Sequence, residues 1–172
     1  IGYDNIGTVE MLMGADGSFN FLEMNTRLQV EHGVTEEVTG VDLVKAQIRS
    51  AAGEKLGAIL PRKISITGHA IQARVYAEDP KNFFPSPGKL TVFRPPQDKS
   101  IRIETGYAEG RDVTPYYDPL IAKVIVHAAD REAVIERLAQ ALEAFDIKGP
   151  KTNIPAVLAI LRSEPFRSGQ VH

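Results

Sequence analysis

Cysteine is absent from the 172-residue sequence, which excludes disulfide bonds, thiolate zinc sites and cysteine nucleophiles and is consistent with a reducing compartment. No apolar run approaches the roughly 18 residues that a membrane span requires, and no segment resembles a signal peptide. Positive charge is not in excess, since 20 lysines and arginines are balanced by 22 acidic residues and the net charge is −2. A general nucleic-acid-binding protein would show a basic excess, so the composition argues against nucleic-acid and membrane partners.

What is present is the composition of a soluble globular protein, with 43% hydrophobic and 24% charged residues. The length suffices for one domain or for two small ones. The sequence begins at Ile1 rather than at methionine, and its first eight residues resemble the interior of a chain. We therefore expect a fragment of a longer protein.

Two strand-like segments, Gly7–Met13 and Ser18–Asn25, flank a turn-forming Gly-Ala-Asp-Gly sequence near the start of the chain. This pattern predicts an antiparallel hairpin. A four-residue loop would place Glu10 opposite Phe21. Glu10 and Glu23 would then be diagonal neighbours on one face, roughly 7 Å apart at the backbone.

Helical signals follow the predicted hairpin. Thr35 is a candidate cap for a short helical turn, and Asp42 precedes a helical segment that Gly53 would terminate. The stretch after Gly53 contains glycines, a proline and no clear hydrophobic period. We therefore expect a domain boundary there, between residues 1–62 and residues 63–172.

Strand patterns dominate the beginning of the second region. Residues 69–78 alternate between apolar and polar side chains, and residues 89–94 and 100–105 are short strand candidates. Residues 119–128 form a nearly continuous apolar run that suits a central strand.

Two helices are predicted after these strands. Asp130 can cap the first, which carries one apolar stripe formed by Val134, Ile135, Leu138, Leu142 and Phe145. The second starts near Ile154, with Asn153 as its candidate cap and a proline in its first turn. The fold class is therefore α+β, with an antiparallel hairpin and helices followed by a mixed α+β domain.

The segment from residue 23 to residue 31 is the most informative for function. Its odd positions are all polar and able to bind ligands: Glu23, Asn25, Arg27, Gln29 and Glu31. If this segment is extended, these five side chains line one face. A solvated edge strand would also produce such a face, so the pattern leaves both interpretations open.

Carboxylates at positions 10 and 23 indicate a cation site. Two such groups close together repel unless a positive charge lies between them, and Mg²⁺ accepts carboxylate oxygens while leaving positions for phosphate oxygens. Asn25 could supply another oxygen. The alternative is an exposed pair stabilised by lysines, but neither strand contains a lysine. Arg27 could hold a flat oxyanion and Glu31 could act as a base toward it, although a salt bridge between these two is an alternative.

These motifs resemble a known family. The sequence EMNTRLQVEH followed by GVTEEVTGVDLVKAQI resembles the signature of biotin carboxylase, the ATP-grasp component of biotin-dependent carboxylases. The later segments HAIQARVYAEDP, NFFPSPGK and PYYDPLIAKVIVHAADREAVIERLAQALEAFDIKGPKTN are similar to that family in the same order. The resemblance therefore spans nearly the whole chain.

The resemblance implies roles at the nucleotide. Positions Glu10 and Glu23, assisted by Asn25, would hold the divalent cations, Mg²⁺ or Mn²⁺, that bridge the ATP phosphates. Glu23 and Leu12 would contact the nucleotide, with Leu12 near the adenine.

Further roles concern bicarbonate and biotin. By the same resemblance, Arg27, Gln29 and the backbone at Val30 would hold bicarbonate. Glu31 would deprotonate it for attack on the γ-phosphate, which gives carboxyphosphate. Arg74 would stabilise the biotin enolate.

The resemblance also implies an organisation and a set of partners. Residues 1–62 would be the C-terminal part of an ATP-grasp domain and residues 63–172 the biotin carboxylase C-terminal domain. Biotin would arrive on a separate carrier protein or domain, because the chain has no biotin-attachment lysine motif. Carboxyltransferase subunits, a homodimeric parent and a cytoplasmic location would follow.

The parent protein would be a bacterial acetyl-CoA carboxylase, with a pyruvate, propionyl-CoA or methylcrotonyl-CoA carboxylase as alternatives. The isolated chain lacks counterparts of the N-terminal ATP-binding half, so we expect it to be inactive. A folded, non-catalytic assembly module is the alternative from a different functional class.

Overall fold

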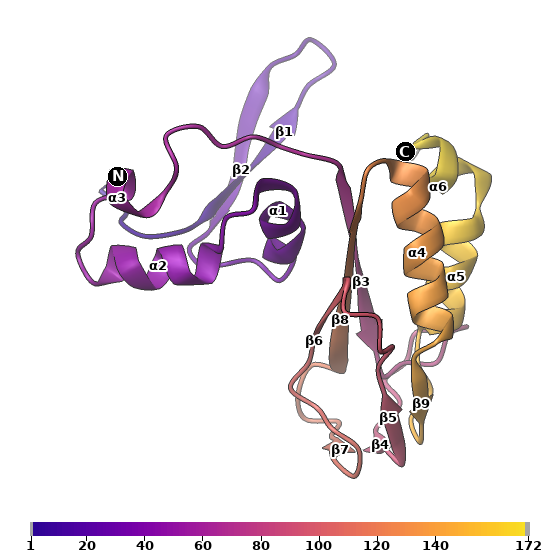
Figure 1. Ribbon diagram of the computed structural model, residues 1–172. Coiled ribbons are helices and arrows are strands. Elements are labelled where there is room, and N and C mark those ends of the chain that lie inside the picture. The colour runs from indigo at the N-terminus through magenta and orange to yellow at the C-terminus, as the bar shows by residue number, and fades with distance from the viewer. Residues whose placement is uncertain (1, 171–172) are drawn as a thin grey trace. The chain divides into compact units, whose positions relative to one another are not determined.

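The computed structural model describes residues 2–170, and the chain divides into two compact units between Ile66 and Thr67 (Figure 1). The fold class is α+β as predicted, and every strand pair in the described residues is antiparallel. Among residues 2–170, no helix combines the length and the apolar character needed to cross a membrane.

The first unit is a β-hairpin followed by helices. Its elements are β1 (Thr8–Met13), β2 (Phe19–Asn25), α1 (His32–Thr39), α2 (Leu43–Ala51) and α3 (Leu56–Ile59). The hairpin is confirmed, but its predicted register is wrong.

Glu10 lies directly opposite Glu23, where the predicted register placed Phe21. Two features each shift the register by one residue. The loop is longer than predicted, because pairing begins at Phe19 rather than Ser18. A β-bulge then displaces the register next to Glu10. The two carboxylates are therefore direct cross-strand neighbours rather than diagonal ones.

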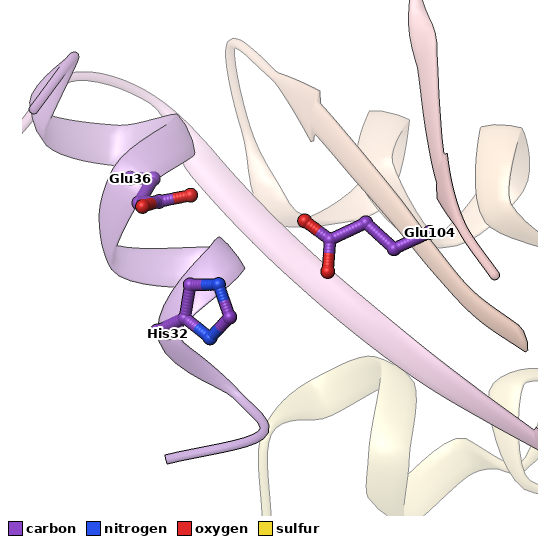
Figure 2. Close-up of side chains that lie close together, drawn as sticks. All are labelled: His32, Glu36 and Glu104. Atoms are coloured by element: carbon purple, nitrogen blue, oxygen red, sulfur yellow. The ribbon is translucent and has the colours of Figure 1, made fainter. Parts of the chain in front are cut away.

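Helix α1 begins earlier than predicted. The backbone N–H of His32 donates to the carbonyl oxygen of Gln29 at 3.2 Å, and the ring Nδ1 of His32 lies 2.7 Å from the same oxygen. This turn directs the chain into a helix with Glu31 at its N-cap position. Thr35 lies inside α1, so its predicted capping role is wrong. Figure 2 shows His32 and Glu36 on successive turns of α1.

The boundaries of α2 are confirmed. The Asp42 side chain accepts a hydrogen bond from the backbone N–H of Lys45 at 2.7 Å, as a helix N-cap does. Gly53 follows the helix with a positive φ of 89°. The buried carboxylate of Glu36 accepts a hydrogen bond from the N–H of Leu43 at 2.7 Å and so connects α1 to the start of α2.

The second unit contains short strands, one central sheet and three helices. Its elements are β3 (His69–Tyr76), β4 (Gly88–Lys89), β5 (Val92–Arg94), β6 (Ile101–Glu104), β7 (Asp112–Val113), β8 (Leu120–Ala128), α4 (Arg131–Glu143), β9 (Asp146–Lys148), α5 (Ile154–Arg162) and α6 (Glu164–Ser168). The main sheet has the order β3-β8-β6, and β4 pairs with β7 and β5 with β9.

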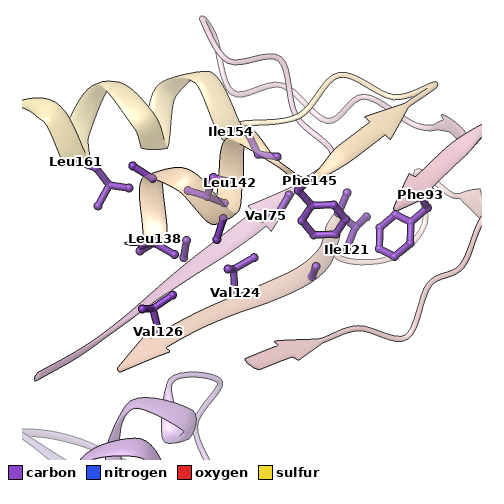
Figure 3. Packing of buried hydrophobic residues seen from close by; sticks show 14 of the residues in the cluster. Val75, Phe93, Ile121, Val124, Val126, Leu138, Leu142, Phe145, Ile154 and Leu161 are labelled. Carbon is purple, nitrogen blue, oxygen red and sulfur yellow. The ribbon is translucent and has the colours of Figure 1, made fainter. Parts of the chain in front are cut away.

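The core of this unit lies between the main sheet and α4 (Figure 3). Strand β8 is central, as its apolar sequence predicted. Ala73 and Val75 of β3 are buried, and so are all five residues of the predicted stripe, although Phe145 lies just beyond the end of α4. The side chain of Asp130 accepts a hydrogen bond from the N–H of Ala133 at 2.9 Å, which confirms the predicted cap.

Helix α5 begins at Ile154 and Asn153 occupies its N-cap position, as predicted, but the Asn153 side chain makes no capping hydrogen bond. The side chain of Asn153 turns to β3 instead of to the first turn of α5. Its Oδ1 accepts a hydrogen bond from the N–H of Tyr76 at 2.9 Å, and its Nδ2 donates to the carbonyl oxygen of Arg74 at 3.0 Å. A tertiary contact therefore replaces the predicted local one.

Candidate functional site

A polar cluster of Glu10, Glu23, Asn25 and Arg27 lies at the end of the hairpin in the first unit. The Nδ2 group of Asn25 donates to Glu10 Oε1 at 2.7 Å and lies 3.5 Å from Glu23 Oε1. One amide group thus bridges the two carboxylates that the register places opposite each other. Its N–H groups supply partial positive charge where two anionic side chains face each other.

Arg27 extends this cluster by one more residue. Its Nη2 donates to Asn25 Oδ1 at 3.4 Å, and its Nη1 donates to the carbonyl oxygen of Leu28 at 3.3 Å. The hydrogen-bonded series Glu10–Asn25–Arg27 therefore places a guanidinium on one side of the amide and a carboxylate on the other. The Arg27 side chain is exposed.

The donor set of this cluster fits a hard divalent cation. Glu10 and Glu23 offer carboxylate oxygens, and Asn25 offers an amide oxygen on the same side chain that already touches both. Oxygen ligands of this kind are the ones that Mg²⁺ binds. A half-turn of the Asn25 amide would turn its oxygen toward the carboxylates, so these three residues could hold the ion.

The predicted extended face from residue 23 to residue 31 is wrong beyond Asn25. Strand β2 ends at Asn25, and the following segment turns into α1. Glu31 has φ −83° and ψ 6°, which is not an extended conformation. The residues Gln29, Val30 and Glu31 therefore lie in the turn before α1 rather than on a strand face. Leu12 lies on β1 and is exposed.

Arg74 lies in the second unit, on the central part of β3. It is in register with Lys123 of β8, which is in register with Glu104 of β6. Directly opposite residues share a face of the sheet, so these three charged residues form a row across it. Ala73 and Val75, on either side of Arg74 along β3, point to the opposite face and are buried against the core.

Glu104 compensates the positive charge of one residue in this row and of one residue on its own strand. Its carboxylate forms ion pairs with Lys123 and with Arg102, two residues earlier on β6. Partial burial opposes the charge of Glu104, but the hydrogen bonds from Lys123 and Arg102 outweigh it and hold the pKa of this carboxyl below its ordinary value. Figure 2 shows the Glu104 side chain extending from β6.

Sequence reasoning missed the contributions of Lys123, Glu104 and Asn153. For Lys123 a signal exists, because it is the only lysine or arginine within the apolar run of residues 119–128. A charged residue at a largely buried strand position needs a partner, and the neighbouring strand supplies Glu104 for the Lys123 side chain, which is 13% exposed. The capping pattern concealed Asn153, because the same residue type serves both at helix caps and in tertiary hydrogen bonds.

Two family descriptions match the chain. Residues 72–172 match the biotin carboxylase C-terminal domain, and residues 1–59 match the ATP-binding domain of the carbamoyl-phosphate synthase L chain. The two matches cover different parts of the chain, and each therefore describes one part only.

Two similar proteins illustrate these matches. Biotin carboxylase 2 of Bacillus subtilis is 50% identical over 171 residues, which are 99% of this chain and 38% of that protein. A pyruvate carboxylase subunit of Methanothermobacter thermautotrophicus is 49% identical over 100% of this chain and 35% of that protein. The chain thus spans less than two fifths of the length of either protein.

A solved structure gives the same result for the fold. The biotin carboxylase domain dimer of the Hydrogenobacter thermophilus 2-oxoglutarate carboxylase, in complex with MgADP, ADP and bicarbonate, superposes with a TM-score of 0.90 and 46% sequence identity. The superposition covers 98% of this chain and 37% of that one. The chain therefore belongs to the biotin carboxylase family.

Proposed function

We propose that this chain supplies part of the active site of a biotin carboxylase, which uses ATP and bicarbonate to carboxylate N1 of biotin on a separate carrier. The hydrogen-bonded series Glu10–Asn25–Arg27 carries the proposal, because it combines cation ligands and an oxyanion-binding group in a chain of this family. The complex of the H. thermophilus relative with MgADP and bicarbonate supports the same two classes of ligand.

In this proposal, residues 1–62 are the C-terminal part of an ATP-grasp domain and residues 63–172 are the C-terminal domain. Glu10, Glu23 and Asn25 hold Mg²⁺ or Mn²⁺, while Glu23 and Leu12 also contact the nucleotide. The bound ion supplies positive charge that offsets the charge of the ATP phosphates. The direct cross-strand placement of Glu10 opposite Glu23, with the Asn25 side chain next to both, supports this assignment.

Bicarbonate is assigned to the turn before α1. Arg27, Gln29 and the backbone at Val30 bind the anion, and Glu31 accepts its proton. An oxygen of the deprotonated anion then forms a bond to the γ-phosphorus of ATP, while the bond from that phosphorus to ADP breaks. Carboxyphosphate and ADP result. The position of this turn at the N-terminus of α1 supports the assignment, because the helix dipole favours an anion there.

Arg74 is assigned to the second half of the reaction. Carboxyphosphate breaks down to CO₂ and phosphate, and the phosphate accepts the N1 proton of biotin. The guanidinium of Arg74 stabilises the enolate oxygen that becomes negative, and N1 forms the new bond to CO₂. The place of Arg74 in register with Lys123, on the sheet face opposite the buried Ala73 and Val75, supports this assignment.

Two variants of a complete biotin carboxylase that carries this sequence test the proposal. Glu31→Gln should abolish bicarbonate-dependent ATP cleavage while the circular dichroism spectrum is unchanged, because the amide cannot accept the proton. Arg74→Ala should spare ATP cleavage more than biotin carboxylation. Surviving activity in Glu31→Gln, or equal losses of both activities in Arg74→Ala, would refute the corresponding role.

The isolated chain is proposed to be inactive. Both faces of the hairpin expose large apolar side chains, namely Val9, Met11, Leu12, Met13, Phe19, Phe21 and Leu22. Such a surface supports the view that further protein covers the hairpin in the active enzyme. The purified chain should show no biotin-dependent ATP cleavage with bicarbonate and Mg²⁺. Turnover well above background would contradict this and would make the chain an enzyme by itself.

The parent is proposed to be a cytoplasmic, homodimeric acetyl-CoA carboxylase component that works with a biotin carboxyl carrier protein and carboxyltransferase subunits. The relative from B. subtilis supports a separate biotin carboxylase, and the domain dimer from H. thermophilus supports dimerisation. The identities of 50% and 49% are too close to select the substrate that is finally carboxylated. An assay that couples the parent to its own carrier and carboxyltransferase partners therefore compares acetyl-CoA with pyruvate. Carboxylation of pyruvate alone would replace the acetyl-CoA proposal.

A further inference from the structure

We propose that Asn153 is a positioning residue for Arg74, which holds the end of β3 from the side opposite β8. The proposal rests on the function proposed above for Arg74. It concerns a buried amide, 8% exposed, that contacts the strand carrying this arginine.

Strand β3 lies at the edge of its sheet. Among the residues that the structure describes, the order β3-β8-β6 gives β3 a neighbouring strand on one side only. On that side the backbone pairing continues past the strand end, where the N–H of Ala77 donates to the carbonyl oxygen of Pro119 at 2.8 Å. Backbone groups of alternate residues point to the outer side of an edge strand and need other partners.

Asn153 supplies those partners at the end of β3. Its Nδ2 donates to the carbonyl oxygen of Arg74 at 3.0 Å, and its Oδ1 accepts from the N–H of Tyr76 at 2.9 Å. Its backbone N–H also donates to the carbonyl oxygen of Tyr76 at 3.2 Å. A primary amide combines a donor and an acceptor as a peptide group does. The side chain therefore takes the place of a missing strand neighbour.

The position of this contact along β3 matters for Arg74. The register between β3 and β8 shifts between Val75 and Tyr76, and such an irregularity disrupts the ladder next to the arginine. The backbone of Arg74 is thus flanked by a regular ladder on one side and a bulge on the other. A small rotation at its Cα would displace the guanidinium at the end of a long side chain, and a displacement of about 1 Å can cost about a hundredfold in rate.

Hydrogen exchange tests the contact in the chain itself, without reference to activity. The amide of Tyr76 should be protected in the unsubstituted chain, and Asn153→Ala should reduce its protection factor by about tenfold or more. An unprotected Tyr76 amide in the unsubstituted chain would overturn the proposal. Protection of Tyr76 is measured in the unsubstituted chain, so this test does not depend on whether a variant folds or on the role of Arg74.

Activity tests the consequence in a complete biotin carboxylase that carries this sequence. Asn153→Ala should lower the rate of biotin carboxylation about ten- to a hundredfold and change bicarbonate-dependent ATP cleavage less than twofold. Leu161→Ala is the matched control, since Leu161 is a buried residue of α5. It should lower the melting temperature without changing the ratio of the two activities. Equal losses of both activities in Asn153→Ala would overturn the positioning role.

The variant Asn153→Asp adds a pH signature. At neutral pH its carboxylate still accepts from the Tyr76 N–H but faces the Arg74 carbonyl oxygen without a donor. Protonation restores a donor, so the ratio of biotin carboxylation to ATP cleavage should rise as pH falls, relative to the unsubstituted enzyme. A ratio that is independent of pH would contradict the proposal. If Arg74→Ala leaves carboxylation intact while Tyr76 is protected, the proposed function of Arg74 fails and the contact stands.

Discussion

Replacement of Glu104 by glutamine should destabilise the second unit, because this carboxylate compensates two positive charges on the same sheet face. Glu104 forms ion pairs with Lys123 and Arg102. In Glu104→Gln the shape remains, but the two cations lose the negative charge between them, and one of the two acceptor oxygens becomes an NH₂ group that cannot accept a hydrogen bond from either cation. The effect therefore reports the loss of the negative charge together with the loss of one hydrogen-bond acceptor.

The magnitude follows from the exposure of the partners. The Lys123 side chain is 13% exposed and that of Glu104 is 27% exposed. Exposed ion pairs contribute about 0.2–1 kcal/mol, whereas loss of one partner of a fully buried pair costs about 3–5 kcal/mol. The pair lies between these limits, so we expect Glu104→Gln to lower the free energy of unfolding by about 2 kcal/mol at neutral pH.

Urea unfolding followed by circular dichroism measures this change, with Glu143→Gln as the control. Glu143 pairs with Arg162, and both side chains are about half exposed, so its loss should be below about 1 kcal/mol. The pKa of Glu104 is lowered by its cationic partners, so its contribution is complete above the ordinary glutamate pKa and disappears as pH falls through the lowered value. Equal losses in both variants, or a Glu104→Gln effect that persists in acid, would refute the reasoning.

Two further predictions concern local geometry. Gly149 has a φ of 116°, and an added Cβ would lie 1.9 Å from the carbonyl oxygen of Lys89, so Gly149→Ala should lower the free energy of unfolding by at least about 3 kcal/mol and lower the melting temperature. Gly106→Ala is the control, because Gly106 has open space around it and the melting temperature should change little; similar melting temperatures of the two variants would contradict this. Asp130→Ala should cost about 1 kcal/mol in urea unfolding, because the bond to the N–H of Ala133 is lost, and Asp130→Asn should retain most of the stability; equal losses would exclude capping as the cause.

Elements that depend on local sequence were predicted correctly. The stripe of α4 is spaced at the helical period, and its cap at Asp130 acts on a backbone group three residues away. Strand β8 is apolar along most of its length because side chains on both of its faces are buried, Ile121 and Ile125 on one face and Val124 and Val126 on the other. In each case the chemistry that decides the structure lies within a few residues of the pattern that predicts it.

The register of the hairpin could not be predicted in the same way. A Gly-Ala-Asp-Gly turn is compatible with more than one loop length, and each added residue moves every cross-strand pair. The bulge next to Glu10 adds a second shift. The direct pairing of Glu10 with Glu23 therefore depends on two local choices of backbone conformation that the alternation of side chains does not encode.

The site was predicted in part. The residue pattern and the family resemblance both indicated Glu10, Glu23, Asn25 and Arg27, and the structure joins all four through hydrogen bonds of the Asn25 side chain. The alternation after Asn25 suggested a longer strand, but the backbone turns there because a helix follows. The hydrogen bonds of Asn153 were not predictable from sequence, since their partners Tyr76 and Arg74 lie 77 and 79 positions away along the chain.

The amide of Asn153 has a consequence for self-association. An edge strand with open backbone groups can template the addition of a strand from another molecule, which leads to aggregation. At the C-terminal end of β3 these groups are already occupied by a side chain that cannot extend the sheet further. The same residue that orients the strand thus also blocks intermolecular β-pairing at this end, and its loss would expose a growth site for β-structure.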